Sequence, residues 1–400
     1  KDLFEFEKKL KSTEEFKKLL NLKVPEIDYI LKGVTDFGIL QNDSISRIIF
    51  LIEVINIKKN RQPSNSVNFY INKRPWINIL SSIAKKYEIN LIPSSFTKRK
   101  FKAQEYPKLY YLVKFLIGLF SKKKSVPKKN NLYLDGRGDL NIEDNGLHSD
   151  FFWYLNSDFP LQNIITKPIN NSKSDILYPS KKLSFKAYFK NLKYFRDSSK
   201  SFEMQSVNRI IRRYKTLKLY WQSFFEENKV KIYLSWNKYD NTHFAISDAI
   251  NSIGGISCIY QLAYDGYRAM ECRMKVDISF IYSKLSSEEV LQDYSKSSYQ
   301  IITGYTKSYA QPLLASEAKK IRERILSNGA KKIIAAFDEN NGYDNRWHTG
   351  AKLQQENYIY LLDELFKDIS LGLVFKPKHG KTLRARLGED VYELLEQAKE

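Results

Sequence analysis

Cysteine is almost absent from this sequence of 400 residues, which contains only Cys258 and Cys272. Two cysteines cannot build a disulfide framework or a cysteine-rich metal site, and their scarcity favours a reducing compartment. Long apolar runs are also missing. Residues 109–120 come nearest, but Lys114 interrupts them, and a membrane-spanning helix needs about 18 apolar residues. Because no secretory signal is visible either, we expect a cytoplasmic protein.

The signatures of several enzyme classes are missing too. There is no Walker A loop, no G-x-S-x-G nucleophile elbow and no C-x-x-C pair, so ATPase, α/β-hydrolase and thiol-redox functions lose most of their support. No D-x-D spacing, no H-x-x-x-H and no three-ligand cluster occurs, so a metal site is only weakly supported. We therefore expect neither a metal ion nor a cofactor.

Positive charge is abundant and unevenly distributed. The net charge is +21, and residues 51–130 hold 18 Lys and Arg against Glu53, Glu88 and Glu105, which amounts to +15. Such a region prefers a polyanion or an anionic membrane surface. The apolar run 109–120 and the lysines after it could lie in the interface on the inner face of the cell membrane. A buried helix followed by a solvated basic loop is the alternative.

Strand-like apolar runs alternate with helical patterns along the chain, which predicts two Rossmann-like α/β domains in series. Before the second domain, strands are expected at 67–71, 89–92, 131–134, 230–234, 256–262, 277–282 and 300–303. The expected divisions are a helical segment (1–60), a Rossmann-like domain (61–310) with a helical and irregular insertion (about 140–228), a connector (311–330) and a second Rossmann-like domain (331–400). That second domain is short, and the sequence ends inside a predicted helix, so we expect a segment of a longer protein.

Two apolar runs of the second domain, 333–337 and 371–375, flank a predicted helix, and each ends in a polar tip. Ligands of open parallel sheets bind at the carboxyl ends of the strands. Cations there suit a diphosphate leaving group, and acidic groups could bind a sugar or pair with the cations. A solvated loop with internal ion pairs is the alternative. The candidate residues are Asp338, Glu339, Asn340, Arg346, Lys376, Lys378 and His379.

His243 follows another predicted strand at a probable helix start, with Asp240 three residues before it. A histidine there could act as a general base on a hydroxyl, oriented by the carboxylate. Alternatively, Asn241 or Thr242 caps the helix while His243 packs inside. Further residues at neighbouring strand ends are expected to line the same crevice: Gln261, Asp265, Gly304 and Tyr305.

This arrangement resembles the GT-B glycosyltransferases, specifically bacterial enzymes that build surface polysaccharide. The resemblance rests on the order of the domains, on the strand IIAAF that opens the second, and on Lys376-Pro377-Lys378-His379. That segment looks like the K-P-x-H strand tip of polyol-phosphate and capsule transferases. The resemblance implies that the N-terminal domain holds the acceptor and the base, while the C-terminal domain holds an activated donor in the interdomain cleft.

We therefore expect a metal-independent transferase that moves a sugar from a nucleotide sugar to a membrane-associated, lipid-linked or polymeric carbohydrate. A polyol-phosphate transferase of the same fold, and an inactive or glycan-binding relative, are alternatives. A nucleic-acid-binding protein is another, although no binding-module signature occurs and the aromatic residues mostly occupy strand positions. We expect no specific nucleic-acid partner. Tight, steeply salt-dependent binding of nucleic acid in a filter assay would favour the nucleic-acid-binding alternative.

Overall fold

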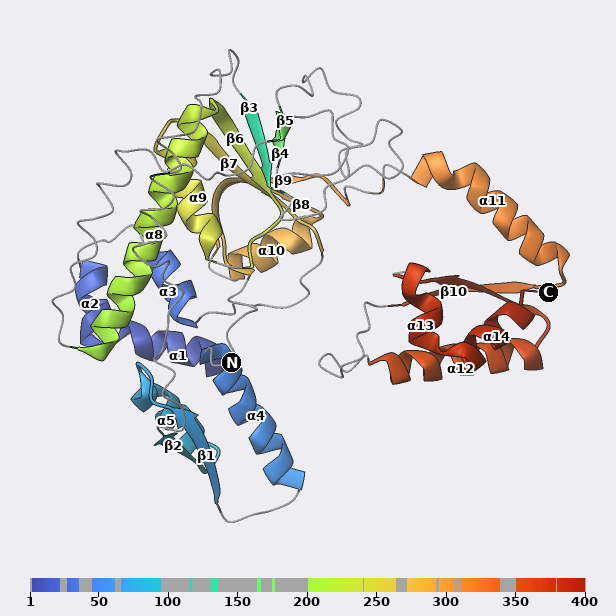
Figure 1. The fold of residues 1–400 in the computed structure, drawn as a ribbon, viewed down its shortest axis with the longest axis horizontal. Coiled ribbons are helices and arrows are strands. Elements are labelled where there is room, and N and C mark those ends of the chain that lie inside the picture. Colours follow the sequence, from blue (N-terminus) through green and yellow to red (C-terminus); the bar gives the residue numbers. More distant parts are fainter. Residues whose placement is uncertain are drawn as a thin grey trace. The chain divides into compact units, whose positions relative to one another are not determined.

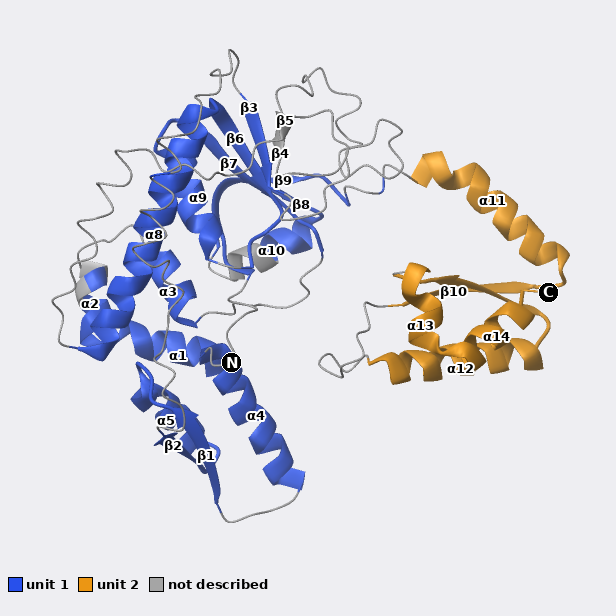
Figure 2. Ribbon diagram, viewed as in Figure 1, with its two compact units in different colours: residues 1–308 blue, residues 309–400 orange. Residues whose placement is uncertain are grey.

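The protein is a mixed α/β chain with parallel sheets, and we describe it from a computed structural model. The chain divides into two compact units, unit 1 (Lys1–Ser308) and unit 2 (Tyr309–Glu400), coloured separately in Figure 2. The structure describes residues 2–21, 27–35, 45–61, 66–94, 116, 131–135, 164–166, 175–176, 201–239, 241–263, 272–292, 295–305, 308, 311–338, 350–378 and 380–399.

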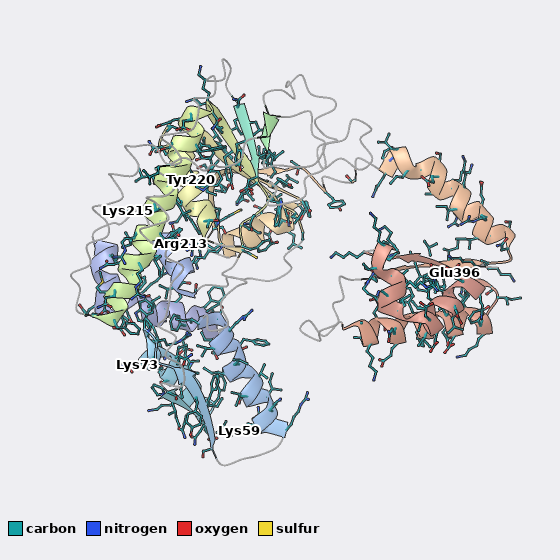
Figure 3. The ribbon with its side chains drawn as sticks, viewed as in Figure 1. Lys59, Lys73, Arg213, Lys215, Tyr220 and Glu396 are labelled. Carbon is teal, nitrogen blue, oxygen red and sulfur yellow. The ribbon has the colours of Figure 1, made fainter. Side chains whose placement is uncertain are left out.

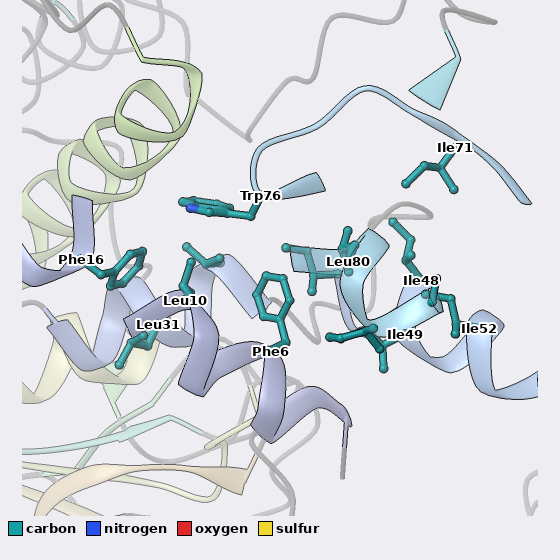
Figure 4. Close-up of a cluster of buried hydrophobic side chains, with 14 of the residues drawn as sticks. Phe6, Leu10, Phe16, Leu31, Ile48, Ile49, Ile52, Ile71, Trp76 and Leu80 are labelled. Carbon is teal, nitrogen blue, oxygen red and sulfur yellow. The ribbon is translucent and has the colours of Figure 1, made fainter. Parts of the chain in front are cut away.

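The N-terminal part of unit 1 combines helices with a small parallel β-α-β unit (Figure 1). Strands β1 and β2 pair with each other in a two-stranded sheet. Their apolar side chains share one core with the helices before them, and Phe6, Leu10, Trp76 and Leu80 meet there (Figure 4). The elements are α1 (Asp2–Lys11), α2 (Glu14–Asn21), α3 (Ile27–Thr35), α4 (Ile45–Arg61), β1 (Val67–Asn72), α5 (Ile77–Lys85) and β2 (Ile89–Ser94).

A seven-stranded sheet forms the rest of unit 1, and its strands are all parallel. The strand order is β5-β4-β3-β6-β7-β8-β9, so the chain builds outward from β3 in one direction and then from β6 in the other. This doubly wound order is compatible with a Rossmann-like α/β fold. The strands are β3 (Asn131–Asp135), β4 (Ile164–Thr166), β5 (Asp175–Ile176), β6 (Val230–Ser235), β7 (Ile256–Tyr260), β8 (Lys275–Ile281) and β9 (Lys296–Ile302). The helices α9 (Thr242–Asn251) and α10 (Lys284–Gln292) connect strands of this sheet.

The long helix α8 (Phe202–Glu227) contributes side chains to the N-terminal core and to a second cluster beside the large sheet. Its start is capped by Ser201, whose hydroxyl accepts a hydrogen bond from the main-chain N of Met204 at 3.3 Å. Val207 near that end is buried among the N-terminal helices. At the other end, Trp221 packs against Tyr133 of β3, with 5.6 Å between the ring centroids. One helix therefore joins the N-terminal elements to the sheet.

Unit 2 is built on the parallel pair β10 (Lys332–Phe337) and β11 (Leu371–Lys376). Tyr358 stacks on Phe375 with 4.5 Å between the ring centroids, and both rings pack with Leu383, Leu387 and Val391. The helices are α11 (Gln311–Ser327), α12 (Ala351–Lys367), the 3-10 turn η7 (Gly380–Thr382), α13 (Leu383–Leu387) and α14 (Glu389–Gln397).

The structure differs from the expected organisation in three places. The strands expected at 67–71 and 89–92 do not join the large sheet, because their apolar side chains are used in the N-terminal core. Two short strands, β4 and β5, occur where an irregular stretch was expected. The expected connector 311–330, for which a helical core was predicted, contains the helix α11 and is grouped with unit 2. Among the helices of the described segments, none has the length and apolarity to cross a membrane.

Candidate functional site

The carboxyl ends of β10 and β11 bring the two polar tips of unit 2 together. Phe337 and Lys376 are the last registered pair, so Asp338 follows one strand directly beside Lys376 of the other. The main-chain N of Asp338 donates to the carbonyl of Lys376 at 3.3 Å. We call residues 376–378 the lysine tip. The sequence-based expectation that these residues share one sheet edge therefore holds for Asp338, Lys376 and Lys378.

The carboxylate of Asp338 is the centre of a buried polar network. Its Oδ1 accepts a hydrogen bond from the main-chain N of Lys378. Its Oδ2 accepts from Gln354 Nε2 at 2.6 Å, and Tyr358 Oη and Arg386 Nη2 each lie 3.4 Å away. The side chains of Asp338 and Arg386 are only 4% and 7% exposed. Asp338 therefore ties the tip to α12 and α13, and its negative charge is matched by Arg386.

One further contact completes this network. Arg386 Nη1 donates to Gln354 Oε1 at 3.0 Å, so guanidinium, amide and carboxylate form a closed ring of hydrogen bonds. Burial and the nearby Asp338 carboxylate raise the pKa of Tyr358 to about 12. The phenol is therefore protonated at neutral pH and donates its hydrogen to Asp338.

The two lysines of the tip are exposed. Lys376 Nζ donates to the carbonyl of Pro377 at 3.3 Å. Because Asp338 is already paired with Arg386, it does not offset the positive charge of these ammonium groups as an exposed carboxylate would. The other candidates in this region, Glu339, Asn340, Arg346 and His379, lie outside the described residues, and their roles stay predictions.

In unit 1, the strand order reverses between β3 and β6, which is where open parallel sheets bind ligands. Asp135 and Ser235 end these strands and are paired in register. Ser235 Oγ donates to the carbonyl of Asp135 at 2.9 Å and accepts from the main-chain N of Asn237 at 3.1 Å. Tyr233 Oη donates to Asp135 Oδ2 at 3.3 Å. We call this group of strand-end residues the switch point.

His243 lies on α9 and is fully buried, with its ring 4.1 Å from that of Phe244. A general base has to come within hydrogen-bond reach of the proton that it takes. A histidine without exposed surface does not reach a bound acceptor in this conformation, so its geometry favours the packing role over the catalytic one. Asp240 lies outside the described residues, and its role stays a prediction.

Of the other expected crevice residues, Gln261 follows β7, and Gly304 and Tyr305 follow β9. Gln261 Oε1 accepts from the main-chain N of Tyr282 at 2.7 Å, which fixes the turn after β7 to the end of β8. Tyr305 packs edge-on against Tyr282, with 5.4 Å between the ring centroids, and is half exposed. Gly304 has a φ of +73°, which a residue with a side chain rarely adopts. Asp265 lies outside the described residues.

Positive charge also follows α8, where Arg209, Arg212, Arg213 and Lys215 are partly exposed. Figure 3 labels Arg213 and Lys215 on this helix, and Lys59 and Lys73 in the N-terminal part of unit 1. Most of the basic stretch 98–129 lies outside the described residues, so its contact with an anionic membrane stays a prediction. In the described part of the chain, no group of three or more His, Cys, Asp or Glu could hold a metal ion.

Two features of these sites were not expected from the sequence, namely Arg386 with Gln354 in unit 2 and the switch point in unit 1. The sequence could have indicated that Arg386 is buried, because Leu383 and Leu387 are four residues apart on α13 and Arg386 falls on the same side of the helix. The switch point had no local signal, since it depends on the order of the strands. Comparisons with protein-family models, curated proteins and solved structures found no match.

Proposed function

We propose that this protein transfers a sugar from a nucleotide-activated donor to a membrane-associated or polymeric carbohydrate, and that the lysine tip binds the diphosphate of the donor. The observation that carries this proposal is the excess of positive charge at the surface of the lysine tip. Lys376 and Lys378 are exposed at the carboxyl end of β11, while the adjacent acid, Asp338, is buried and paired with Arg386. The edge therefore presents two exposed ammonium groups, which suit an anionic ligand.

The proposed reaction uses these cations where negative charge develops. The bond between the anomeric carbon of the sugar and the phosphate oxygen breaks, and its electron pair stays on the departing nucleoside diphosphate. Ammonium groups beside that oxygen stabilise the charge without a metal ion. The acceptor hydroxyl forms the new bond to the anomeric carbon and loses its proton to a base, for which Asp240 is our candidate in place of the buried His243.

Two observations in unit 1 support its role on the acceptor side. The order of the strands reverses between β3 and β6, and open parallel sheets bind ligands at such a position. Tyr305 offers a half-exposed aromatic ring just after β9, at the carboxyl end of the same parallel sheet. An exposed aromatic ring suits a carbohydrate, because the apolar C–H face of a sugar can pack on it.

The product of the reaction distinguishes sugar transfer from polyol-phosphate transfer, because the two reactions break different bonds. Sugar transfer releases a nucleoside diphosphate. Polyol-phosphate transfer breaks the diphosphate itself and releases a nucleoside monophosphate. Both donors present a diphosphate that the lysine tip could bind, so the same fold and tip serve either reaction.

The test incubates the full chain with a panel of nucleotide sugars and nucleoside diphosphate polyols, together with membranes that carry lipid-linked carbohydrate. We expect release of a nucleoside diphosphate that depends on both a nucleotide sugar and the membranes, measured by ion-exchange chromatography. Release of a nucleoside monophosphate from a polyol donor would replace sugar transfer by the alternative. If no donor gives a product while purified protein binds none of them, the proposal is wrong.

A further inference from the structure

We propose that Arg386 is a positioning residue for donor binding, and that it acts through Asp338 on the main chain of the lysine tip. This inference rests on the proposed function, because it concerns the diphosphate site of unit 2. Arg386 lies on α13 between Leu383 and Leu387, both of which belong to the core of unit 2. Its side chain is 7% exposed, so it does not reach a ligand at the surface.

A buried guanidinium is costly unless carboxylates or other acceptors face it. Arg386 Nη2 lies 3.4 Å from Asp338 Oδ2, and its Nη1 donates to Gln354 Oε1 at 3.0 Å. Gln354 in turn donates to the same Asp338 oxygen at 2.6 Å. The carboxylate is therefore held from two sides, by a charged group on α13 and by an amide on α12.

The other oxygen of the same carboxylate holds the tip. Asp338 Oδ1 accepts from the main-chain N of Lys378, and the main-chain N of Asp338 donates to the carbonyl of Lys376. Pro377, between the two lysines, has no N–H and a fixed φ. One hydrogen bond accepted by Asp338 and one donated by it thus fix the backbone on either side of Pro377, and they set the directions from which both lysine side chains start.

The consequence is preorganisation. A cation contributes most to binding a diphosphate when its position needs no further ordering at the moment of binding. The lysine side chains are long and exposed, so the backbone beneath them is the part that the protein can fix in advance. Arg386 supplies that order from the interior by orienting Asp338. The guanidinium itself stays away from the ligand.

The test measures the binding of inorganic pyrophosphate to the full chain by calorimetry, and hydrogen exchange at the main-chain amide of Lys378. We expect Arg386→Gln and Asp338→Asn each to weaken binding about tenfold or more and to speed exchange at Lys378 about tenfold. Asparagine has one acceptor oxygen and one NH2 group, so it cannot accept from Lys378 and face Arg386 as a carboxylate does. Arg386→Lys, which keeps the cation, should recover part of the binding.

Tyr358→Phe is the matched control. It removes a hydroxyl 3.4 Å from the same Asp338 oxygen but leaves the ion pair, so binding and exchange at Lys378 should stay within about twofold of the wild type. Amides of β11 report on folding. A variant that folds keeps these amides protected from hydrogen exchange. If Arg386→Gln loses that protection, the test uses Asp338→Asn alone, because asparagine keeps the size of the side chain.

The outcomes separate this inference from the function on which it rests. If the wild-type chain does not bind pyrophosphate, the proposed diphosphate site is wrong. If the wild type binds, but Arg386→Gln and Asp338→Asn bind as tightly with β11 intact, the site stands and the positioning role of Arg386 is wrong. Faster exchange at Lys378 without weaker binding also overturns that role, because the order of the backbone would then not matter to the ligand.

Discussion

Replacing Glu7 by glutamine should lower the stability of unit 1 by about 3–5 kcal/mol, the usual cost of removing one partner from a buried ion pair. Glu7 of α1 accepts two hydrogen bonds from Arg273, at 3.0 and 2.9 Å. The two side chains are 5% and 3% exposed, so little water is present to solvate the guanidinium once the carboxylate is gone. Lys11 Nζ also lies 2.6 Å from the same carboxylate. The pair joins two segments 266 residues apart.

The same pair should make the stability of unit 1 sensitive to acid. Burial raises the pKa of Glu7, but hydrogen bonds and charge attraction from Arg273 and Lys11 outweigh it, and the net pKa lies below the ordinary value of 4.5. A carboxyl group whose pKa is lower in the folded chain contributes stability that is complete above its unfolded pKa. That contribution is lost as the pH falls through the folded pKa. The difference between wild type and Glu7→Gln should therefore shrink below about pH 4.5.

Urea unfolding followed by tryptophan fluorescence measures both effects. The signal reports mainly on unit 1, because four of the five tryptophans of the sequence belong to it and only Trp347 belongs to unit 2. The control is Glu7→Leu with Arg273→Met, which removes both charges and should recover most of the stability that the single change loses. A loss below about 1 kcal/mol for Glu7→Gln at pH 7 would refute the reasoning, since that value is typical of an exposed pair. So would a double variant that is less stable than the single one.

Two further predictions concern packing. Burial, with a smaller effect of Asp277, raises the pKa of the Cys258 thiol to about 12. At pH 8 the thiol should therefore react with Ellman's reagent only after unfolding, and rapid labelling of the native chain would contradict this. Gly372→Ala would press a Cβ against Ile325 and bring it to 3.1 Å from the Cβ of Ala330, so it should cost about 1–3 kcal/mol in urea unfolding of unit 2. Gly380→Ala, with its nearest neighbour at 3.9 Å, is the control and should change stability by less than about 0.5 kcal/mol.

The sequence predicted most strands well, because their apolar runs are strong local signals. The run Ile333 to Phe337 is β10 almost to the residue, and the run 371–375 is β11 without its last residue. The strands β4 and β5 have three and two residues, which is too short to display an alternating pattern. They form by pairing beside β3, and no pattern within the sequence reports that pairing.

The membership of a strand in a sheet was harder to predict than the strand itself. Residues 67–72 and 89–94 have the same local character as strands of the large sheet, yet they pair only with each other. What decides this is where their apolar faces are buried. Ile71 and Ile89 pack with helices α1 to α5, and that choice depends on contacts between distant segments.

The candidate site shows the same limit. The two lysines and Asp338 could be predicted to share an edge, because parallel strands end together. The net charge of that edge could not be predicted, because Arg386, which pairs with Asp338, lies 48 residues further along the chain. The polar pattern around His243 indicated a base, whereas its burial favours the packing role, and burial is a property of the folded chain.

The most direct test of the central claim is calorimetric titration of the full chain with nucleoside diphosphates, using two matched pairs of substitutions. Lys376→Ala with Lys378→Ala removes two cations from the carboxyl end of the strand pair. Lys331→Ala with Lys332→Ala removes the same charge from the amino end, where Lys332 is registered with Leu371. A charge-assisted hydrogen bond contributes about 1.5–3 kcal/mol, and about 1.4 kcal/mol corresponds to a factor of ten. We expect the first pair to weaken binding about 100-fold or more and the second to change it less than about threefold; equal losses in both pairs, or no loss in the first, would contradict a diphosphate site at the lysine tip.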